Sequence, residues 1–486
     1  MDLLLIRPND AKAIYGGISE NAACEPPFWA AQIAAYCRSK NVSVTILDAE
    51  GYNMSPEEMI AKVKEFSPKL IGIIITGTNL SASTWKMNGA SLCAKMIKSS
   101  ANIPVFMWGL HSSALPVQTM EEEEIDFVMK GEGLDSIVSL VNHLGDLNAY
   151  DAMKGLYYRD VNGEIRGNQQ LNLIDADALP APAWDLLPME LYKAHNWQRF
   201  GEKESGPKGY AVIATSLGCP FQCSFCAVSA LFGARKVRYL QPKTVISIID
   251  ELVNKYNVKY IKILDECFVL NMNHVEEICD LLIERDYDLN IWAYARVDTV
   301  NERILAKLKK AGIQWLAYGI ESASELSLKD VSKGQYNLQN IKESMKITQD
   351  AGIHIMANFM FGLPEDTKET MEMTLALAKD INPEFINFYC TMAYPGSKLY
   401  HECIENNVKL PDSWIGYSEY SYESEPLPTK YLTSKEVLAF RDSAFENFFE
   451  NNERYFQMIQ KKFGEKTVQS IHEMLTRKMK RKLLEE

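Results

Sequence analysis

The chain has 486 residues, more than one hydrophobic core usually serves, so two or three domains are expected. Its 47% hydrophobic and 24% charged residues are typical of a globular protein. The formal net charge of −13 argues against nucleic acid or an anionic membrane as the main partner, because both attract basic surfaces. The basic run from Arg477 to Lys482 is interpreted as one solvated face of a terminal helix.

The apolar segments are too short for a membrane or a secretion signal. Leu70–Gly77 has the length of a strand, and the apolar N-terminus is shorter than a signal peptide. The cysteines outside the motif described below have no disulfide-framework spacing and are expected to be reduced, mostly buried thiols. We therefore expect a cytoplasmic protein.

Short apolar strands alternate with helical stretches over residues 1 to about 145. The expected strands are Leu3–Arg7, Ser43–Asp48, Leu70–Thr76, Val105–Gly109 and Phe127–Gly131, and the expected helices are Trp29–Lys40, Pro56–Phe66, Thr84–Ser99 and Asp135–Leu144. This alternation predicts an α/β fold, a doubly wound parallel sheet over residues 1–148. Ligands of such sheets bind beyond the carboxyl ends of the strands, which here carry small and polar residues.

Residues 149–208 are predicted to link two domains. Asn162-Gly163 lies between two apolar arms and predicts a tight hairpin. The stretch Leu179–Pro188 is too rich in proline for a regular helix or central strand, so we expect a segment wrapped over the surface. Glycines and charged residues from Gly201 to Gly209 complete the linker.

A second, longer alternation occupies residues 209–400. The expected strands are Tyr210–Ala214, Tyr260–Leu264, Asn290–Tyr294, Trp315–Gly319, His354–Phe361 and Phe385–Cys390, and the expected helices are Thr244–Tyr256, His274–Arg285, Glu302–Ala311, Leu338–Ala351 and Lys368–Lys379. Such strand–helix units predict a curved parallel sheet, a partial (β/α)6 barrel, with its active residues on loops at the carboxyl ends of the strands.

Three cysteines follow the first strand of this barrel. Cys219, Cys223 and Cys226 have the spacing CxxxCxxC, and Phe225 precedes the last of them. Thiolates at this spacing can wrap a tight loop around one iron–sulfur cluster. Three thiolates leave one iron of a four-iron cluster free for a cofactor that chelates through an amine and a carboxylate. The alternative is a zinc site with a fourth ligand from elsewhere.

Residues 401–486 are predicted to form a helical segment that closes the barrel. Asp412–Pro428 is rich in aromatic residues, prolines and acids and is interpreted as an irregular cover. Two helices are expected from Ser434 onward, separated at Gly464, and their phenylalanine stripe is interpreted as packing.

The cysteine motif resembles the radical S-adenosylmethionine (SAM) superfamily. The resemblance implies a four-iron four-sulfur (4Fe-4S) cluster on Cys219, Cys223 and Cys226, with SAM at the open iron. It further implies SAM-binding roles at the strand ends for Phe225, Asp265, Glu266, Arg296, Glu321, Ser322 and Asn358. Each has a structural alternative, such as an Arg296–Asp298 ion pair or capping by Asp265 and Glu266.

The first domain resembles the cobalamin-binding domain that precedes many radical SAM enzymes. The matching elements are Pro26-Pro27, the Thr/Ser-rich loop after the third strand, the Gly-x-His after the fourth and the Gly-Glu-Gly after the fifth. The implied cobalamin-binding residues are Thr76, Thr78, Asn79, Leu80, Ser81, Gly109, His111, Gly131, Glu132 and Gly133. The alternative is a doubly wound fold without cofactor, kept for substrate or subunit contact.

Two departures from the cobalamin pattern are informative. Trp108 stands where the family usually has glycine, and its indole would narrow the groove for the nucleotide tail. The chain lacks an Asp-x-His-x-x-Gly motif, so no lower axial histidine is expected, and His111 is interpreted as a hydrogen-bonding loop residue.

The resemblance implies that a 5′-deoxyadenosyl radical takes hydrogen from an unactivated carbon of a small-molecule substrate, which cobalamin then methylates. An electron donor such as flavodoxin or ferredoxin would reduce the cluster. One alternative is a radical SAM oxidoreductase or cyclase of the same architecture without methyl transfer. Another is a sensor that binds cobalamin or SAM without turnover.

Overall fold

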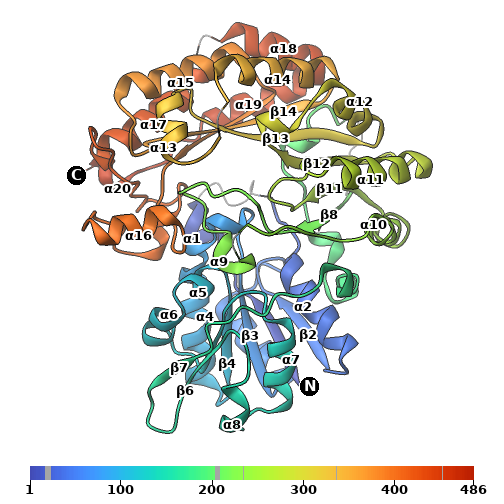
Figure 1. Ribbon diagram of the computed structural model, residues 1–486, viewed down its shortest axis with the longest axis vertical. Coiled ribbons are helices and arrows are strands. Elements are labelled where there is room, and N and C mark those ends of the chain that lie inside the picture. Colours follow the sequence, from blue (N-terminus) through green and yellow to red (C-terminus); the bar gives the residue numbers. More distant parts are fainter. Residues whose placement is uncertain (17–22, 203–207, 234, 335, 451, 486) are drawn as a thin grey trace.

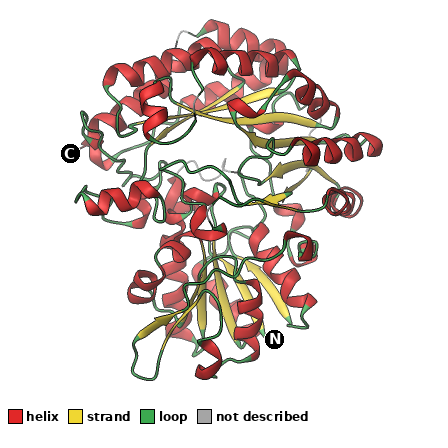
Figure 2. Ribbon diagram, in the orientation of Figure 1, coloured by secondary structure: helices red, strands yellow, loops and turns green. Residues whose placement is uncertain are grey.

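The structure is a computed structural model that describes residues 1–16, 23–202, 208–233, 235–334, 336–450 and 452–485. Two sheets lie one above the other along the long axis, with loops between them (Figures 1 and 2). The predicted fold class, a doubly wound sheet followed by a partial barrel and C-terminal helices, is confirmed. Part of the charged join, residues 203–207, lies outside the described residues.

The N-terminal sheet has the strand order β2-β1-β3-β4-β5-β6-β7. Its strands are β1 (Leu3–Arg7), β2 (Val44–Asp48), β3 (Leu70–Ile75), β4 (Val105–Gly109), β5 (Phe127–Met129), β6 (Leu156–Arg159) and β7 (Ile165–Gly167). Its helices are α1 (Ala11–Tyr15), α2 (Phe28–Ser39), α3 (Pro56–Phe66), α4 (Met87–Ser100), α5 (Leu110–Ala114), α6 (Pro116–Glu122), α7 (Leu134–Asn142) and α8 (Leu147–Tyr150).

Both faces of this sheet are buried. In β1, Leu3 and Leu5 join the core on one face, while Leu4 and Ile6 join the core on the other. Helices on both faces therefore leave the strands as continuous apolar runs rather than alternating patterns. At the start of α3, Ser55 forms a capping box with Glu58, which explains why the predicted start of this helix matches the structure.

The hairpin differs from its sequence assignment. We expect it in the linker, whereas β6 pairs antiparallel with β5 and β7 pairs with β6, so the hairpin extends the N-terminal sheet. Leu156 is fully buried and Tyr157 and Tyr158 are nearly so, which accounts for the pairing, since an isolated hairpin has little stability in water.

The second sheet is an open, all-parallel half barrel with the order β15-β14-β13-β12-β11-β8. Its strands are β8 (Gly209–Ile213), β11 (Val258–Ile263), β12 (Asn290–Ala295), β13 (Ile313–Glu321), β14 (His354–Phe361) and β15 (Phe385–Cys390). Its helices are α10 (Pro242–Tyr256), α11 (Met272–Arg285), α12 (Glu302–Lys310), α13 (Glu325–Asp330), α14 (Leu338–Asp350), α15 (Lys368–Ile381) and α16 (Lys398–Glu405).

Aromatic residues fill one end of the concave side of this half barrel. Trp197, Trp292 and Trp315 pack together as a buried aromatic floor. Towards the carboxyl ends, Tyr294 of β12 and Tyr389 of β15 are half-buried. The residues before and after each tyrosine in its strand point to the opposite face of the sheet and are buried. The carboxyl-end loop that contains Ala227 contacts the N-terminal domain, because the Ala227 amide donates to the Ser81 hydroxyl at 2.9 Å.

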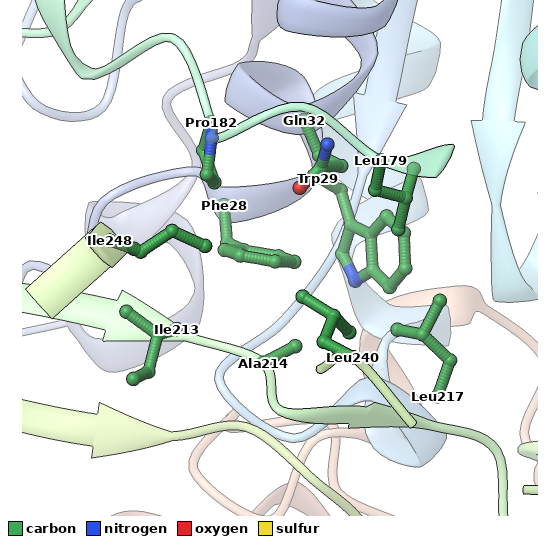
Figure 3. A pocket seen from close by; sticks show the side chains of 10 residues that line it. All are labelled: Phe28, Trp29, Gln32, Leu179, Pro182, Ile213, Ala214, Leu217, Leu240 and Ile248. Carbon is green, nitrogen blue, oxygen red and sulfur yellow. The ribbon is translucent and has the colours of Figure 1, made fainter. Parts of the chain in front are cut away.

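The linker seals the joint between the two domains. Figure 3 shows an apolar pocket there, lined by Phe28 and Trp29 of α2, Pro182 of the linker and Ile213 and Ala214 at the end of β8. Its polar lining side chain, Gln32, donates a hydrogen bond to the Pro180 carbonyl at 2.9 Å. This pocket is therefore part of the packing between the two domains.

The C-terminal segment has more breaks than expected. Its helices are α17 (Ser434–Phe449), α18 (Glu453–Phe463), α19 (Glu465–Leu475) and α20 (Lys482–Glu485). The expectation of two helices is wrong, because the chain also breaks before α18, where the Asn452 side chain caps the helix by accepting from the Tyr455 amide. In the described part of the chain, no helix is long and apolar enough to cross a bilayer.

Candidate active site

The three-cysteine loop lies between the two sheets. It follows the short strand β9 (Ser216–Leu217), which pairs with β10 (Arg238–Tyr239), and it leads into α9 (Ser229–Phe232), beside α5 (Figure 1). Gly218 has φ +91°, and a Cβ there would lie 2.3 Å from the Lys236 carbonyl oxygen, so only glycine fits this turn. The three thiols are half-buried and form no disulfide.

Backbone hydrogen bonds fix the loop to the barrel. The Ser224 amide donates to the Val331 carbonyl at 2.9 Å, and the Leu399 amide donates to the Ser224 carbonyl at 2.8 Å. Within the loop, the Cys226 amide donates to the Cys223 carbonyl at 3.0 Å. The cysteines are therefore held at the carboxyl ends of the barrel strands, where barrel enzymes place reactive groups.

Without a bound metal, the thiols of Cys219 and Cys226 stay protonated. Burial raises the pKa of Cys219 to about 11 and that of Cys226 to about 12, and the neighbouring Glu266 and Cys223 reinforce both shifts. Among the described residues, no three or more His, Cys, Asp or Glu side chains gather closely enough to hold one metal ion, and this includes the three cysteines of the loop. Three free thiols on one loop fit a larger iron–sulfur cluster, which replaces their protons on binding.

Two cations, Arg296 after β12 and Lys333 after α13, lie near the aromatic rings of this loop. The Arg296 guanidinium carbon is 3.7 Å from the ring centre of Phe221, and the Lys333 ammonium is 5.9 Å from that of Phe225. Arg296 also forms a forked pair with Asp298, with both bonds at 2.9 Å. The structural alternative for Arg296 is thus present, although the pair leaves the guanidinium beside the cysteine loop.

Glu321 occupies a strained position at the end of β13. Its φ is +64°, and the pairing register with β14 shifts between Gly319 and Glu321. Such a bulge re-aims a side chain at a strand end. Here it brings the carboxylate to 2.7 Å from the Lys333 ammonium.

The remaining residues predicted to bind SAM divide into buried and accessible ones. Asp265 is 3% exposed and accepts hydrogen bonds from the Thr215 amide, the Thr215 hydroxyl and the Ser216 hydroxyl, each at 2.6 Å. It therefore fastens the start of the cysteine loop. By contrast, Glu266 is half-buried, and burial raises its pKa to about 7.

Ser322 and Asn358 have protein partners. Ser322 is fully buried, and its hydroxyl accepts from the Ser324 amide at 3.0 Å. Asn358 donates to the Tyr318 carbonyl at 3.1 Å and accepts from the Asn387 amide group at 2.9 Å. Both side chains therefore have hydrogen-bond partners within the protein.

The loop after β3 reaches from the N-terminal domain to the cysteine loop. Thr76, Thr78 and Asn79 remain partly or fully exposed, whereas Leu80 is buried. The Ser81 hydroxyl accepts a hydrogen bond from the Ala227 amide at 2.9 Å and lies 3.6 Å from the Cys226 sulfur. The residues expected to face a corrin thus adjoin the expected cluster site.

The other positions expected to bind cobalamin are buried. A Cβ at Gly109 would lie 2.2 Å from the Ile75 carbonyl oxygen, so β4 runs close against β3 there. His111 is 1% exposed, its ring packs 4.5 Å from that of Trp414, and burial lowers its pKa to about 3. Trp108 is fully buried, and its indole N–H donates to the Glu132 carbonyl at 2.9 Å.

The Gly131–Gly133 turn serves the domain interface. Gly131 and Gly133 have φ of +76° and +64°, and Gly133 precedes α7. The Glu132 carboxylate is fully buried, accepts from Arg238 and from the Ile174 amide at 2.9 Å, and has no exposed surface for a corrin. Its contacts instead join the N-terminal domain, the linker and β10.

Sequence reasoning missed a second interdomain cluster around Glu25. The Lys262 ammonium of β11 lies 2.9 Å from the Glu25 carboxylate and donates to the Thr78 carbonyl at 2.5 Å. Glu25 also pairs with His195 and accepts from the Tyr210 hydroxyl, both at 2.9 Å. Burial opposes ionisation of Glu25, but Lys262 and His195 outweigh it and lower the pKa to about 2. A lysine inside an apolar strand was the available signal.

Residues 213–378 match the radical SAM superfamily, and residues 17–141 match the B12 binding domain. An uncharacterized methyltransferase of Pyrococcus horikoshii is 31% identical over 452 residues, 92% of this chain and 92% of that protein. The chain belongs to the cobalamin-binding radical SAM family. It is a radical SAM enzyme, and the cofactors of its family are a 4Fe-4S cluster, SAM and cobalamin.

Other members and solved structures cover most of the chain. The anaerobic magnesium-protoporphyrin IX monomethyl ester cyclase of Rubrivivax gelatinosus is 26% identical over 459 residues, 93% of this chain and 78% of the cyclase. TsrM from Kitasatospora setae, a radical SAM methyltransferase solved with cobalamin and a 4Fe-4S cluster, has a TM-score of 0.68 at 16% identity, covering 92% of this chain and 89% of TsrM. The cobalamin-dependent enzyme OxsB has a TM-score of 0.72 at 16% identity, covering 97% and 70%. Both share the fold.

The C-terminal cover places a buried acid near the end of β15. Glu419 is 8% exposed, and its Oε1 accepts from the Cys390 amide at 2.9 Å. Within the described residues its Oε2 has no hydrogen-bond partner. Burial raises the pKa of Glu419 to about 8 against the opposing effect of Arg441 and Arg481.

The Glu419→Gln variant is expected to lose less stability than wild type as pH rises. Because the folded protein holds the Glu419 proton up to about pH 8 and the unfolded chain releases it near its ordinary pKa of 4.5, wild-type stability falls between these values. The limiting slope is about 1.4 kcal/mol per pH unit, and glutamine removes it. Urea-unfolding midpoints at pH 5.5 and 7.5 measure the difference, and parallel profiles for the two proteins would contradict it.

Proposed function

We propose that this protein is a cobalamin-dependent methyltransferase that methylates an unactivated carbon of a small-molecule substrate. The observation that carries the proposal is the contact of Ser81 with Cys226 and Ala227, which puts the expected corrin loop against the expected cluster loop. The methyl carrier and the radical source would then face the same space. The similarity to the methyltransferase of Pyrococcus horikoshii supports this assignment.

The assignment divides the chain by role. Residues 1–148 would bind cobalamin, residues 149–208 would join the domains, residues 209–400 would bind the cluster and SAM, and residues 401–486 would cover the barrel. When bound, the cluster supplies an electron, SAM a radical and a methyl group, and cobalamin a methyl carrier. The chain would hold these groups, orient them and exclude water.

Individual side chains support these roles through their positions. Cys219, Cys223 and Cys226 would hold the cluster, and Arg296 beside their loop offers a cation for a carboxylate of SAM. The half-buried Tyr294 and Tyr389 would line the substrate space, and burial raises the pKa of both phenols, so they remain neutral hydrogen-bonding groups.

The test uses the full-length protein, purified anaerobically and reconstituted with iron, sulfide and cobalamin. It is incubated with SAM labelled with carbon-13 in the methyl group, flavodoxin with its reductase, and a fraction of small-molecule metabolites. We expect 5′-deoxyadenosine, S-adenosylhomocysteine and a labelled product. If 5′-deoxyadenosine forms but the label never leaves SAM, methyl transfer is wrong, and the oxidoreductase or cyclase alternative holds.

The cyclase alternative has support of its own in the similarity to the Rubrivivax gelatinosus enzyme over 93% of this chain. The sensor alternative predicts neither 5′-deoxyadenosine nor S-adenosylhomocysteine. An electron donor such as flavodoxin or ferredoxin is part of the proposal, since the cluster must be reduced before SAM is cleaved.

A further inference from the structure

We propose that Ser81 is a positioning residue for the cluster, whose hydroxyl donates a hydrogen bond to the Cys226 sulfur and thereby raises the reduction potential of the cluster. The inference rests on the proposed cluster site. It assigns to the N-terminal domain a direct part in the chemistry of a cofactor that the barrel holds.

The Ser81 hydroxyl has a hydrogen-bond donor and a hydrogen-bond acceptor of the cysteine loop within reach. Ser81 Oγ accepts the Ala227 amide hydrogen at 2.9 Å, which uses an oxygen lone pair. Cys226 Sγ lies 3.6 Å from the same oxygen, within the range of a hydrogen bond to sulfur. The hydroxyl therefore accepts a hydrogen bond from the Ala227 amide and donates one to the Cys226 sulfur.

The position of Ser81 is fixed from both sides. Its amide donates to the Asn79 side chain at 3.0 Å, which starts the 3-10 turn Leu80–Ala82. Leu80 is 4% exposed, so the turn is anchored in the core. Before the turn, the Thr78 carbonyl accepts from the Lys262 ammonium at 2.5 Å. These contacts hold the backbone of the turn to both domains, and the Ala227 amide holds the Ser81 hydroxyl oxygen beside the sulfur.

A hydrogen bond to a cysteine ligand stabilises the state in which sulfur carries more negative charge. Reduction of a cluster increases that charge, so a donor to sulfur favours the reduced cluster and raises its potential. In the described residues no side-chain donor reaches the sulfur of Cys219 or Cys223, which makes the contact to Cys226 asymmetric. The effect of Ser81 is therefore expected to be measurable by a single substitution.

The test compares two variants of nearly equal size, Ser81→Thr and Ser81→Val, of which only threonine keeps the hydroxyl. Both full-length proteins are reconstituted with iron and sulfide, and the cluster is titrated by EPR without SAM or cobalamin. We expect Ser81→Thr to keep the wild-type midpoint and Ser81→Val to shift to a lower potential. Ser229→Ala, at an exposed serine near the same loop, is the control and should leave the midpoint unchanged.

Equal midpoints in Ser81→Thr and Ser81→Val at equal iron content would overturn the role of Ser81. If neither β-branched variant retains iron, the comparison of wild type with Ser81→Ala decides by the same criterion. A wild-type protein that binds no cluster would instead overturn the proposed function. The two failures are thus distinguishable.

Discussion

Replacing Cys223 by alanine is expected to reduce cluster content and the yield of 5′-deoxyadenosine from SAM to background. Cys223 lies between the other two cysteines in the sequence, and it contributes to the raised pKa of both. With two thiolates the loop cannot hold three irons and leave the fourth for SAM. Iron and sulfide assays on anaerobically reconstituted protein, together with chromatography of the nucleoside, measure the loss.

The matched control is Cys403→Ala. Cys403 is a buried thiol of α16 that packs among apolar side chains. Its removal creates a small cavity but leaves the loop intact, so iron content is expected to stay at the wild-type level. SAM cleavage by the Cys223→Ala protein at the wild-type rate would refute the assignment of the loop.

The second large effect is expected on stability when the Glu132–Arg238 pair is broken. The Glu132 side chain is fully buried and that of Arg238 is 18% exposed. Arg238 also donates to the Ile174 carbonyl at 2.6 Å, so the pair joins three segments of the chain. Removing one partner leaves the other charge buried and uncompensated, which costs about 3–5 kcal/mol. The Glu132→Ala variant should therefore unfold at a markedly lower urea concentration.

An exposed pair provides the comparison. Arg303, 80% exposed, binds Glu276 at 2.7 Å, and Arg303→Ala should cost less than about 1 kcal/mol because water screens such pairs. Replacing both Glu132 and Arg238 by leucine should cost less than removing Glu132 alone, since no charge is then left unpaired. Equal unfolding midpoints for Glu132→Ala and Arg303→Ala would show that the interface does not depend on this pair.

The sequence was most informative where periodicity and caps agree. The strands Leu3–Arg7, Val105–Gly109 and His354–Phe361 and the helix Pro56–Phe66 have the predicted bounds. The apolar runs of the strands are bounded there by polar residues, proline or glycine, and the helix starts at a capping box. The cysteine loop was identifiable from spacing alone, since its ligands are close neighbours in the chain.

Pairing between residues that are far apart in the chain could not be predicted from the sequence. Nothing in Leu156–Tyr158 indicates that these residues pair with β5, because an amphipathic arm suits either a free hairpin or a sheet edge. For the same reason the sequence could not assign Glu132 to Arg238, which lies 106 residues away. The Gly-Glu-Gly pattern indicated a ligand loop, whereas the acid between the glycines contacts protein.

Lys262 extends from the second strand of the barrel, yet its charge is neutralised by Glu25 of the N-terminal domain. A barrel expressed by itself would keep an uncompensated ammonium in its interior, and the excised N-terminal domain would keep an unmatched carboxylate. Residues 25 and 262 are therefore expected to change together in evolution. In a chimera that takes its N-terminal domain from another family member, Glu25 and Lys262 would have to be exchanged together, because each neutralises the other.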